Sequence, residues 1–198
     1  MRIEPMKGLE DVLLIHPDLH EDERGYFYEV FNEKEFNEKT GGKYDFHALQ
    51  ENESKSSKFV FRGLHFQKPP YEQAKLVRVL SGAVIDFAVD IRKGSPTFGR
   101  YVCAILTPTN KNQFFVPRGF AHGFLVLTDE AVFEYKCDNY YNRESEGGLR
   151  WDDANITDAE DEVVTLKRCL KSYLKDLDLN LMILSEKDKN RITTLKDM

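Results

Sequence analysis

The 198-residue sequence lacks any hydrophobic run long enough to form a membrane-spanning helix. Such a helix needs roughly 18 to 20 consecutive apolar residues, whereas the best candidate, residues 82–89, is interrupted by Asp86. The first five residues also lack the apolar stretch of a secretory signal peptide. We therefore expect a cytoplasmic protein that has no membrane partner.

Cysteine is scarce, with three residues at positions 103, 137 and 169. Their number is odd, they lie far apart in the sequence, and none forms a CxxC motif. A disulfide framework or a cysteine-based metal site would need paired spacings. We expect reduced thiols, as in most cytosolic proteins, and assign them no chemistry.

The sequence also lacks an excess of positive charge. It contains 28 Lys and Arg against 34 Asp and Glu, which gives a formal net charge of -6 at pH 7. A nucleic-acid-binding domain is usually basic, so no nucleic-acid partner is expected, and an anionic ligand must meet a local cluster of cations. The 41% hydrophobic and 31% charged residues are typical of a folded globular protein.

Short β-rich runs separated by turn residues fill the sequence between residues 59 and 137. The clearest runs are residues 75–80, 83–91, 100–106, 113–116, 123–127 and 131–137. Ser81-Gly82 predicts a two-residue hairpin between the first two runs. Polar and apolar residues alternate along the second run, with Asp86 and Asp90 on one face, so that face is expected to be wet or functional. Regularly spaced short strands predict a β-sandwich, jelly roll or barrel.

Helical patterns flank this β-rich region. A short helix is predicted near residues 33–39, and Gly41-Gly42 would end it. A second, amphipathic helix is predicted within residues 160–177, where apolar residues recur at helical spacing: Val163, Val164, Leu166, Leu170, Tyr173, Leu174 and Leu177. We expect one main domain, residues 1–153, with residues 154–198 forming a helical extension packed on it.

Several motifs, taken in order, carry a resemblance to a known family. They are DERGYFYE (22–29), QENES (50–54), RGLHFQ (62–67), KLVRV (75–79), AVDIRKGSPTFG (88–99), VPRGFAHGF (116–124) and YKCDNYY (135–141). Over roughly residues 10–153 the sequence closely resembles the dTDP-4-dehydrorhamnose 3,5-epimerase family. After residue 153 it departs from that pattern, and residues 154–184 form a longer, helix-prone connection.

The resemblance implies a mainly β fold, a cupin-type double-stranded β-helix or jelly roll, working as a homodimer without a cofactor or metal. The implied substrate is the dTDP-sugar dTDP-4-dehydro-6-deoxy-D-glucose, inverted at C3 and C5 to give dTDP-4-dehydro-L-rhamnose. His65 matches the general base, Tyr135 the acid on the opposite face, and Lys75 the residue near the C4 oxygen, while Asp188 resembles the partner of the base. Substrate or nucleotide contacts are implied for Arg24, Phe27, Glu29, Gln50, Asn52, Arg62, His122 and Tyr141.

This chemistry agrees with the residue types. C3 and C5 both lie next to the C4 ketone, so loss of either proton gives an enolate whose charge collects on the C4 oxygen. Inversion needs a base on one face of the sugar and a proton donor on the other. A carboxylate bonded to the second ring nitrogen of His65 would fix its tautomer and stabilise the imidazolium.

Three alternatives remain open from the sequence. Pro117-x-Gly119-x-x-His122 resembles the second metal motif of cupin enzymes, although His65-Phe66-Gln67 stands where the first motif has His-x-His, which leaves few metal ligands. The chain could also bind a sugar nucleotide without catalysis. The third alternative is epimerisation at one centre only, or 3,4-ketoisomerisation of a related sugar nucleotide.

Overall fold

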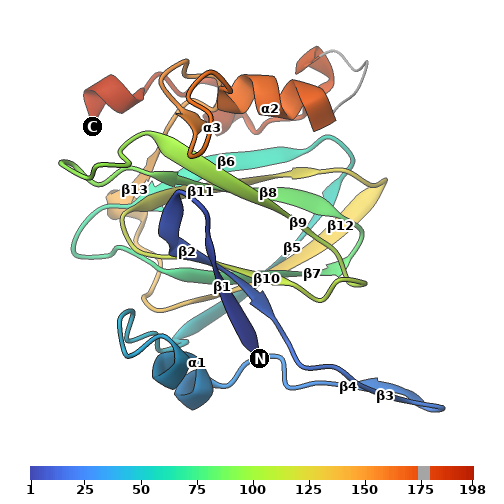
Figure 1. The fold of residues 1–198 in the computed structure, drawn as a ribbon. Coiled ribbons are helices and arrows are strands. Elements are labelled where there is room, and N and C mark those ends of the chain that lie inside the picture. Colours follow the sequence, from blue (N-terminus) through green and yellow to red (C-terminus); the bar gives the residue numbers. More distant parts are fainter. Residues whose placement is uncertain (174–178) are drawn as a thin grey trace.

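Two six-stranded sheets packed face to face form the body of the protein. The structure is a computed structural model that describes residues 1–173 and 179–198. The first sheet contains, in spatial order, β1 (Arg2–Met6), β2 (Leu9–His16), β10 (Gln113–Val116), β7 (Lys75–Ser81), β12 (Glu130–Cys137) and β5 (Gln50–Ser57). The second contains β13 (Glu146–Gly148), β6 (Phe61–Gln67), β11 (Phe120–Val126), β8 (Val84–Asp90), β9 (Arg100–Leu106) and β14 (Thr157–Asp158). Figure 1 shows the two layers, and the prediction of a mainly β, cupin-like jelly roll is confirmed.

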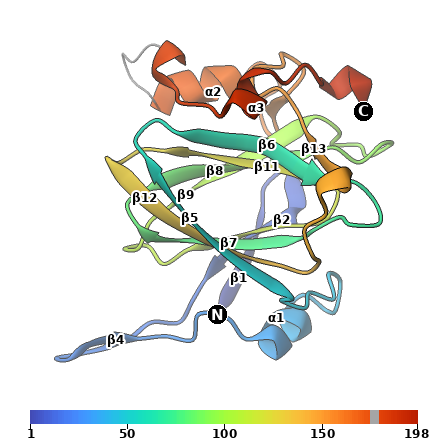
Figure 2. The same cartoon turned by 180° about the vertical axis from the view of Figure 1, so that it is seen from behind.

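A small hairpin and a helix lie outside the two sheets. The hairpin consists of β3 (His20–Asp22) and β4 (Gly25–Phe27) and projects from the body of the molecule (Figures 1 and 2). The helix α1 (Glu33–Lys39) has the predicted bounds. The side chain of Asn32 caps its first turn by accepting a hydrogen bond from the backbone N–H of Glu35.

The space between the sheets is filled by alternate residues of each strand. Val77 and Val79 of β7 and Phe133 of β12 point inward from the first sheet and meet Phe124 and Val126 of the second. Successive side chains of a strand point to opposite faces. A polar residue that lies two positions from one of these apolar residues in the same strand therefore also faces the interior.

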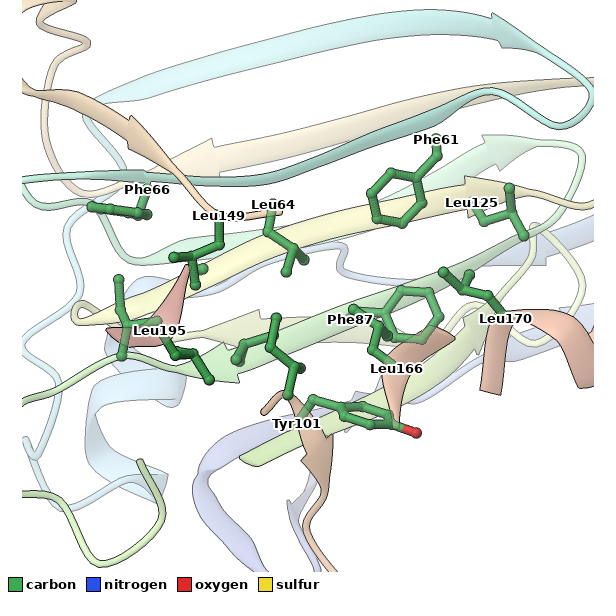
Figure 3. Packing of buried hydrophobic residues seen from close by; sticks show 14 of the residues in the cluster. Phe61, Leu64, Phe66, Phe87, Tyr101, Leu125, Leu149, Leu166, Leu170 and Leu195 are labelled. Atoms are coloured by element: carbon green, nitrogen blue, oxygen red, sulfur yellow. The ribbon is translucent and has the colours of Figure 1, made fainter. Parts of the chain in front are cut away.

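The C-terminal segment covers the outer face of the second sheet, as both views of the ribbon show (Figures 1 and 2). It contains α2 (Leu166–Tyr173), α3 (Glu186–Lys189) and two short 3-10 helices, Leu179–Leu181 and Leu195–Asp197. A third 3-10 helix, Arg143–Ser145, precedes β13. Figure 3 shows Leu166 and Leu170 packed with Phe87 and Tyr101 of the sheet. Among the described residues, no helix has the length and apolar character that a bilayer span requires.

Replacement of Leu170 by alanine tests the contribution of this packing. Its side chain is fully buried in the cluster under α2. The lost contacts and the cavity should lower the free energy of unfolding by about 2–5 kcal/mol, measured by urea denaturation. The control is Val163→Ala, because Val163 is 71% exposed and its truncation should change stability by less than about 0.5 kcal/mol. Equal effects of the two substitutions would contradict the packing role of α2.

The predicted hairpin at Ser81-Gly82 is wrong. β7 and β8 lie in different sheets, so the turn carries the chain from one layer to the other. Gly82 has φ +78° and touches the β11–β12 connection so closely that a Cβ atom would overlap the carbonyl oxygen of Glu130. The backbone N–H of Ala83 donates to Oγ1 of Thr128 at 2.9 Å in the same connection. These long-range contacts separate the two strands.

The face of β8 that was expected to be wet or functional is not wet. All seven residues of the strand are buried, including Asp86 and Asp90. The carboxylate of Asp90 accepts hydrogen bonds from Arg92, Ser95 and Thr97 in the following loop. Asp86 faces the interior between the sheets, and its partner is described with the site below.

The predicted C-terminal helix begins later than residue 160. It begins at Leu166, because Thr165 forms a β-bridge with Thr157 and its hydroxyl accepts a hydrogen bond from the N–H of Arg168 at 3.3 Å. Asp161 caps the preceding turn at the N–H of Val163. Two of the residues that supported the prediction, Leu174 and Leu177, lie outside the described residues.

Candidate active site

Four polar side chains enter the space between the sheets from opposite layers. On β6, Leu64 and Phe66 belong to the outer cluster under the C-terminal segment, so His65 between them points inward. His122 of β11 is its cross-strand neighbour. In the first sheet, Lys75 of β7 lies two residues before the inward-facing Val77, and Tyr135 of β12 lies two residues after the inward-facing Phe133, so both also point inward.

His65 is paired with the carboxylate of Asp188. Its Nε2 lies 2.7 Å from Oδ1 of Asp188, a buried residue of α3. Ser185 caps α3 and holds this carboxylate, since its hydroxyl donates to Oδ2 at 2.9 Å. Burial opposes the ionisation of Asp188, but the hydrogen bond and charge of His65, with help from Ser185 and Arg191, hold the pKa of the carboxyl below its ordinary value. In neutral His65 the Nε2–H donates to Asp188, which leaves the lone pair on Nδ1.

Lys75 and Tyr135 form the opposite side of the site. The Nζ atom of Lys75 lies 5.7 Å from the ring centroid of Tyr135. Burial lowers the pKa of Lys75, and the carboxylates of Asp86 and Glu146 oppose this effect. Burial also raises the pKa of Tyr135, with a small opposing influence from Arg62. The phenol therefore keeps its proton near neutral pH and is suited to donate it.

His122 has its own buried carboxylate partner. Nε2 of His122 lies 2.7 Å from Oδ1 of Asp86, and both side chains are buried. Burial raises the pKa of Asp86, whereas the neighbouring His122 acts to lower it. The ring of His122 also stacks on Phe133, with 6.1 Å between the centroids. Asp86 was not named as a site residue, although the alternation of its strand, β8, had marked its face as wet or functional.

The predicted contacts on β5 and β6 are arranged beside these four residues. Asn52 is the cross-strand partner of Tyr135. Gln50 donates from Nε2 to Oδ1 of Asn52 at 2.9 Å, and its Oε1 accepts from the N–H of Tyr141 at 3.0 Å. Arg62 donates from Nε to the hydroxyl of Ser56 at 2.9 Å, and its guanidinium is exposed enough to meet a ligand.

Glu146 is a further residue of this region that was not predicted. It lies on β13, which pairs with β6 so that Gly148 is opposite His65. One oxygen accepts from the hydroxyl of Tyr141 at 2.9 Å, and the other contacts Lys187. Nothing in the sequence distinguishes Glu146 from an ordinary surface carboxylate, because its role depends on strand pairing.

The structure does not bring three predicted contact residues to this site within one chain. Arg24 and Phe27 lie in the β3–β4 hairpin, which projects on the side of the molecule opposite α3 (Figures 1 and 2). Arg24 pairs with Asp22, with 3.1 Å between Nε and Oδ2, and Phe27 is 73% exposed. Glu29 accepts a hydrogen bond from the side chain of Asn32 at 2.9 Å.

Among the described residues, no group of three or more His, Cys, Asp or Glu side chains is arranged to hold a metal ion. His122, which suggested a cupin metal motif, contacts Asp86, and His65 contacts Asp188. Each histidine thus forms a pair with one carboxylate.

Comparison with known proteins identifies the family. The sequence profile of dTDP-4-dehydrorhamnose 3,5-epimerase matches residues 6–197. The chain belongs to this family. It is 53% identical over 148 residues to the dTDP-4-dehydrorhamnose 3,5-epimerase of Shigella flexneri, which covers 75% of this chain and 81% of that protein. The resemblance drawn from the motifs is therefore confirmed, and the chain is an epimerase, an enzyme of the isomerase class.

Solved structures of the family show the same fold. The crystal structure of the epimerase from Elizabethkingia anophelis has a TM-score of 0.84 and 47% identity, and the match covers 100% of this chain and 97% of that one. The dTDP-6-deoxy-D-glucose-3,5-epimerase of Legionella pneumophila, solved in complex with dTDP-4-keto-L-rhamnose, has a TM-score of 0.82 and 40% identity over 98% of this chain and 93% of that one. The family profile extends to residue 197, whereas the alignment with the Shigella flexneri protein covers 148 residues, so the expected divergence after residue 153 stays a prediction.

Proposed function

We propose that this epimerase inverts dTDP-4-dehydro-6-deoxy-D-glucose at C3 and C5 and gives dTDP-4-dehydro-L-rhamnose. The observation that carries this proposal is the entry of His65 and Tyr135 into one interior space from opposite sheets. A sugar ring bound between the sheets would have the imidazole on one face and the phenol on the other. Inversion needs this arrangement, because one group that removes and returns the proton on the same face retains the configuration.

In the proposed reaction, Nδ1 of His65 removes the proton from C3 or C5. Asp188 accepts the Nε2–H hydrogen bond at 2.7 Å and stabilises the imidazolium that forms. Lys75 stands where the charge of the enolate collects, on the C4 oxygen, and a donor of this kind contributes about 2.7–4 kcal/mol in comparable oxyanion sites. Tyr135 then delivers its proton to the opposite face of the same carbon.

Gln50, Asn52, Arg62, His122 and Tyr141 are proposed to bind the substrate. Arg62 offers a guanidinium beside Tyr135 that can pair with a phosphate oxygen. Half-exposed Tyr141 offers an aromatic face for the base of the nucleotide. We also propose that residues 1–153 form the epimerase domain, that residues 154–198 complete it by supplying Asp188, and that the protein is cytoplasmic.

The function is tested by incubating the unaltered protein with the keto sugar nucleotide in D2O and following the sugar by NMR. We expect deuterium at both C3 and C5 and the L-rhamno configuration in the product. Deuterium and inversion at one carbon alone would instead support a single-centre epimerase, and movement of the ketone to C3 would support a 3,4-ketoisomerase. Loss of the reaction on chelation with EDTA would support the metal-dependent alternative, and binding without turnover would support a binding module.

We further propose that the enzyme is a homodimer in which the β3–β4 hairpin reaches the site of the other copy. Within one chain, Arg24 and Phe27 lie on a projecting hairpin, and an aromatic side chain that is 73% exposed is suited to a contact outside its own chain. In a two-fold dimer each hairpin would serve the neighbouring site. Glu29 follows the hairpin and would be placed by it.

A mixed dimer tests this arrangement. One copy carries His65→Ala and the other carries Arg24→Ala with Phe27→Ala, and two affinity tags isolate the heterodimer. One of its two sites then combines an intact His65 with an intact hairpin, so about half of the unaltered activity is expected. Both variant homodimers should be far less active. A heterodimer no more active than the variant homodimers would show that the hairpin does not act on the partner's site.

A further inference from the structure

Arg191 contacts two carboxylates, that of Glu146 and that of Asp188, the partner of His65. It follows α3, and its side chain is 12% exposed. Its Nε lies 3.4 Å from Oδ1 of Asp188, the same oxygen that accepts the hydrogen bond of His65. Its Nη2 lies 3.7 Å from Oε1 of Glu146. The guanidinium therefore places a permanent positive charge next to the carboxylate of Asp188 that pairs with His65.

Gly148 makes room for this guanidinium. Gly148 is the cross-strand partner of His65, and a Cβ atom at this position would overlap Cζ, Nε and Nη1 of Arg191. The φ angle of Gly148 is not in the left-handed region, so the backbone does not require glycine there. Its lack of a side chain lets Arg191 pack against the strand beside His65.

We propose that Arg191 is a positioning residue for the base, holding Asp188 in place and opposing the accumulation of positive charge on His65. This inference depends on the proposed function, because it assigns Arg191 a role only through His65. Arg191 acts on the substrate only through Asp188 and His65.

The charge around His65 explains why such a residue matters. The charged and titratable groups that the surrounding elements turn toward the interior, or that contact Asp188 or Glu146, are Arg62 (β6), Lys75 (β7), Asp86 (β8), His122 (β11), Tyr135 and Cys137 (β12), Tyr141, Glu146 (β13), and Lys187, Asp188 and Arg191 in and after α3. Among them, the carboxylate of Asp188 lies 2.7 Å from Nε2 of His65, and that of Glu146 lies 3.7 Å from Arg191, so both place negative charge in this region. A base must be unprotonated to act, and the positive charge of Arg191 offsets these two carboxylates.

The pH dependence of kcat/KM tests the inference. In Arg191→Gln the two carboxylates act without this counter-charge, so His65 should keep its proton to higher pH. The acid limb of the profile, the pH range below which kcat/KM falls, should then move to higher pH by roughly one unit. Arg191→Lys keeps the charge and should leave the limb near its original position. The control is Arg150→Gln, which removes the cation of the Arg150–Asp152 surface pair, 2.8 Å apart, and should not move the limb.

A second variant disturbs the contact between Arg191 and Asp188 through Gly148 and leaves Arg191 itself unchanged. Gly148→Ala should displace the guanidinium of Arg191 and move the acid limb upward in the unaltered background. It should have no additional effect on the limb in Arg191→Ala, where nothing remains to be displaced. Circular dichroism of each variant establishes that the fold is kept, and Gly148→Ala provides the test if Arg191→Gln does not fold.

The outcomes separate this inference from the proposed function. If the unaltered protein takes up no deuterium from D2O into the keto sugar, the proposed function fails and the inference fails with it. If the unaltered protein is active but the acid limbs of Arg191→Gln and Gly148→Ala lie at the same pH as that of the unaltered protein, only the role of Arg191 is overturned. The same follows if Arg191→Lys moves the limb as far as Arg191→Gln.

Discussion

Replacement of His65 by alanine is expected to abolish deuterium exchange at both C3 and C5 of the keto sugar. One imidazole serves both carbons, because both lie next to the same ketone and share the enolate oxygen near Lys75. Loss of a general base costs about 10²–10⁴-fold in rate. NMR in D2O follows the two positions separately, so a base that served only one of them would be detected.

The matched control for this variant is His47→Ala. His47 is an exposed histidine whose Nδ1 lies 2.8 Å from Glu33, at the start of α1. Its loss should leave both exchange reactions at the rate of the unaltered enzyme. Deuterium uptake by His65→Ala at the same rate as His47→Ala would refute the assignment of His65 as the base.

Replacement of Tyr135 by phenylalanine is expected to separate exchange from inversion. The substitution keeps the ring and removes the hydroxyl, while His65 and Asp188 remain in place. Proton removal should therefore continue, with a loss of less than about tenfold, but inversion at C5 should fall by about 10²–10⁴-fold because the donor on the second face is gone. The NMR signature is deuterium in a sugar that keeps its original configuration at C5.

Tyr44→Phe is the control for the loss of a tyrosine hydroxyl. The hydroxyl of Tyr44 donates to the backbone carbonyl of Asp11 at 2.9 Å, in the cluster around α1. This variant should invert both centres at the original rate. Normal inversion by Tyr135→Phe would contradict the role of Tyr135 as the proton donor.

Local sequence signals predicted the strands between residues 75 and 137 and the helix α1, but not β1, β2 or the β3–β4 hairpin. The strands β9 and β10 and the helix α1 have the predicted bounds, 100–106, 113–116 and 33–39. Each is bounded by residues with a local effect, such as the cap at Asn32 or Gly41 at φ +62°. Alternation within a strand and punctuation between strands do not depend on the rest of the fold, so they can be recognised from the sequence.

Features that depend on distant contacts were not predicted. Ser81-Gly82 has the composition of a hairpin turn, but the contacts of Gly82 with Glu130 lead the chain into the other sheet. In the same way, the helical pattern from residue 160 gives no sign that Thr165 pairs with Thr157 and delays the start of α2. Tertiary contacts override local preference at both places.

The residues of the site were likewise predictable only where local sequence or a family motif marked them. His65 and Asp188 are 123 positions apart, and only the family resemblance suggested that they meet. Asp86, Glu146 and Arg191 were not recognised as part of the site, because a single charged residue in a sequence usually indicates a solvated surface. Strand pairing and the return of the C-terminal segment bring them to His65, and neither can be deduced from their immediate neighbours.

The most direct test of the account is a crystal structure of the protein with the dTDP-linked keto sugar bound. We predict that the ring lies between the sheets, with Nδ1 of His65 on one face and the hydroxyl of Tyr135 on the other, each about 3–3.5 Å from the carbon on which it acts. The C4 oxygen should point to Nζ of Lys75. A sugar bound outside this space, or both groups on the same face of the ring, would contradict the proposed mechanism.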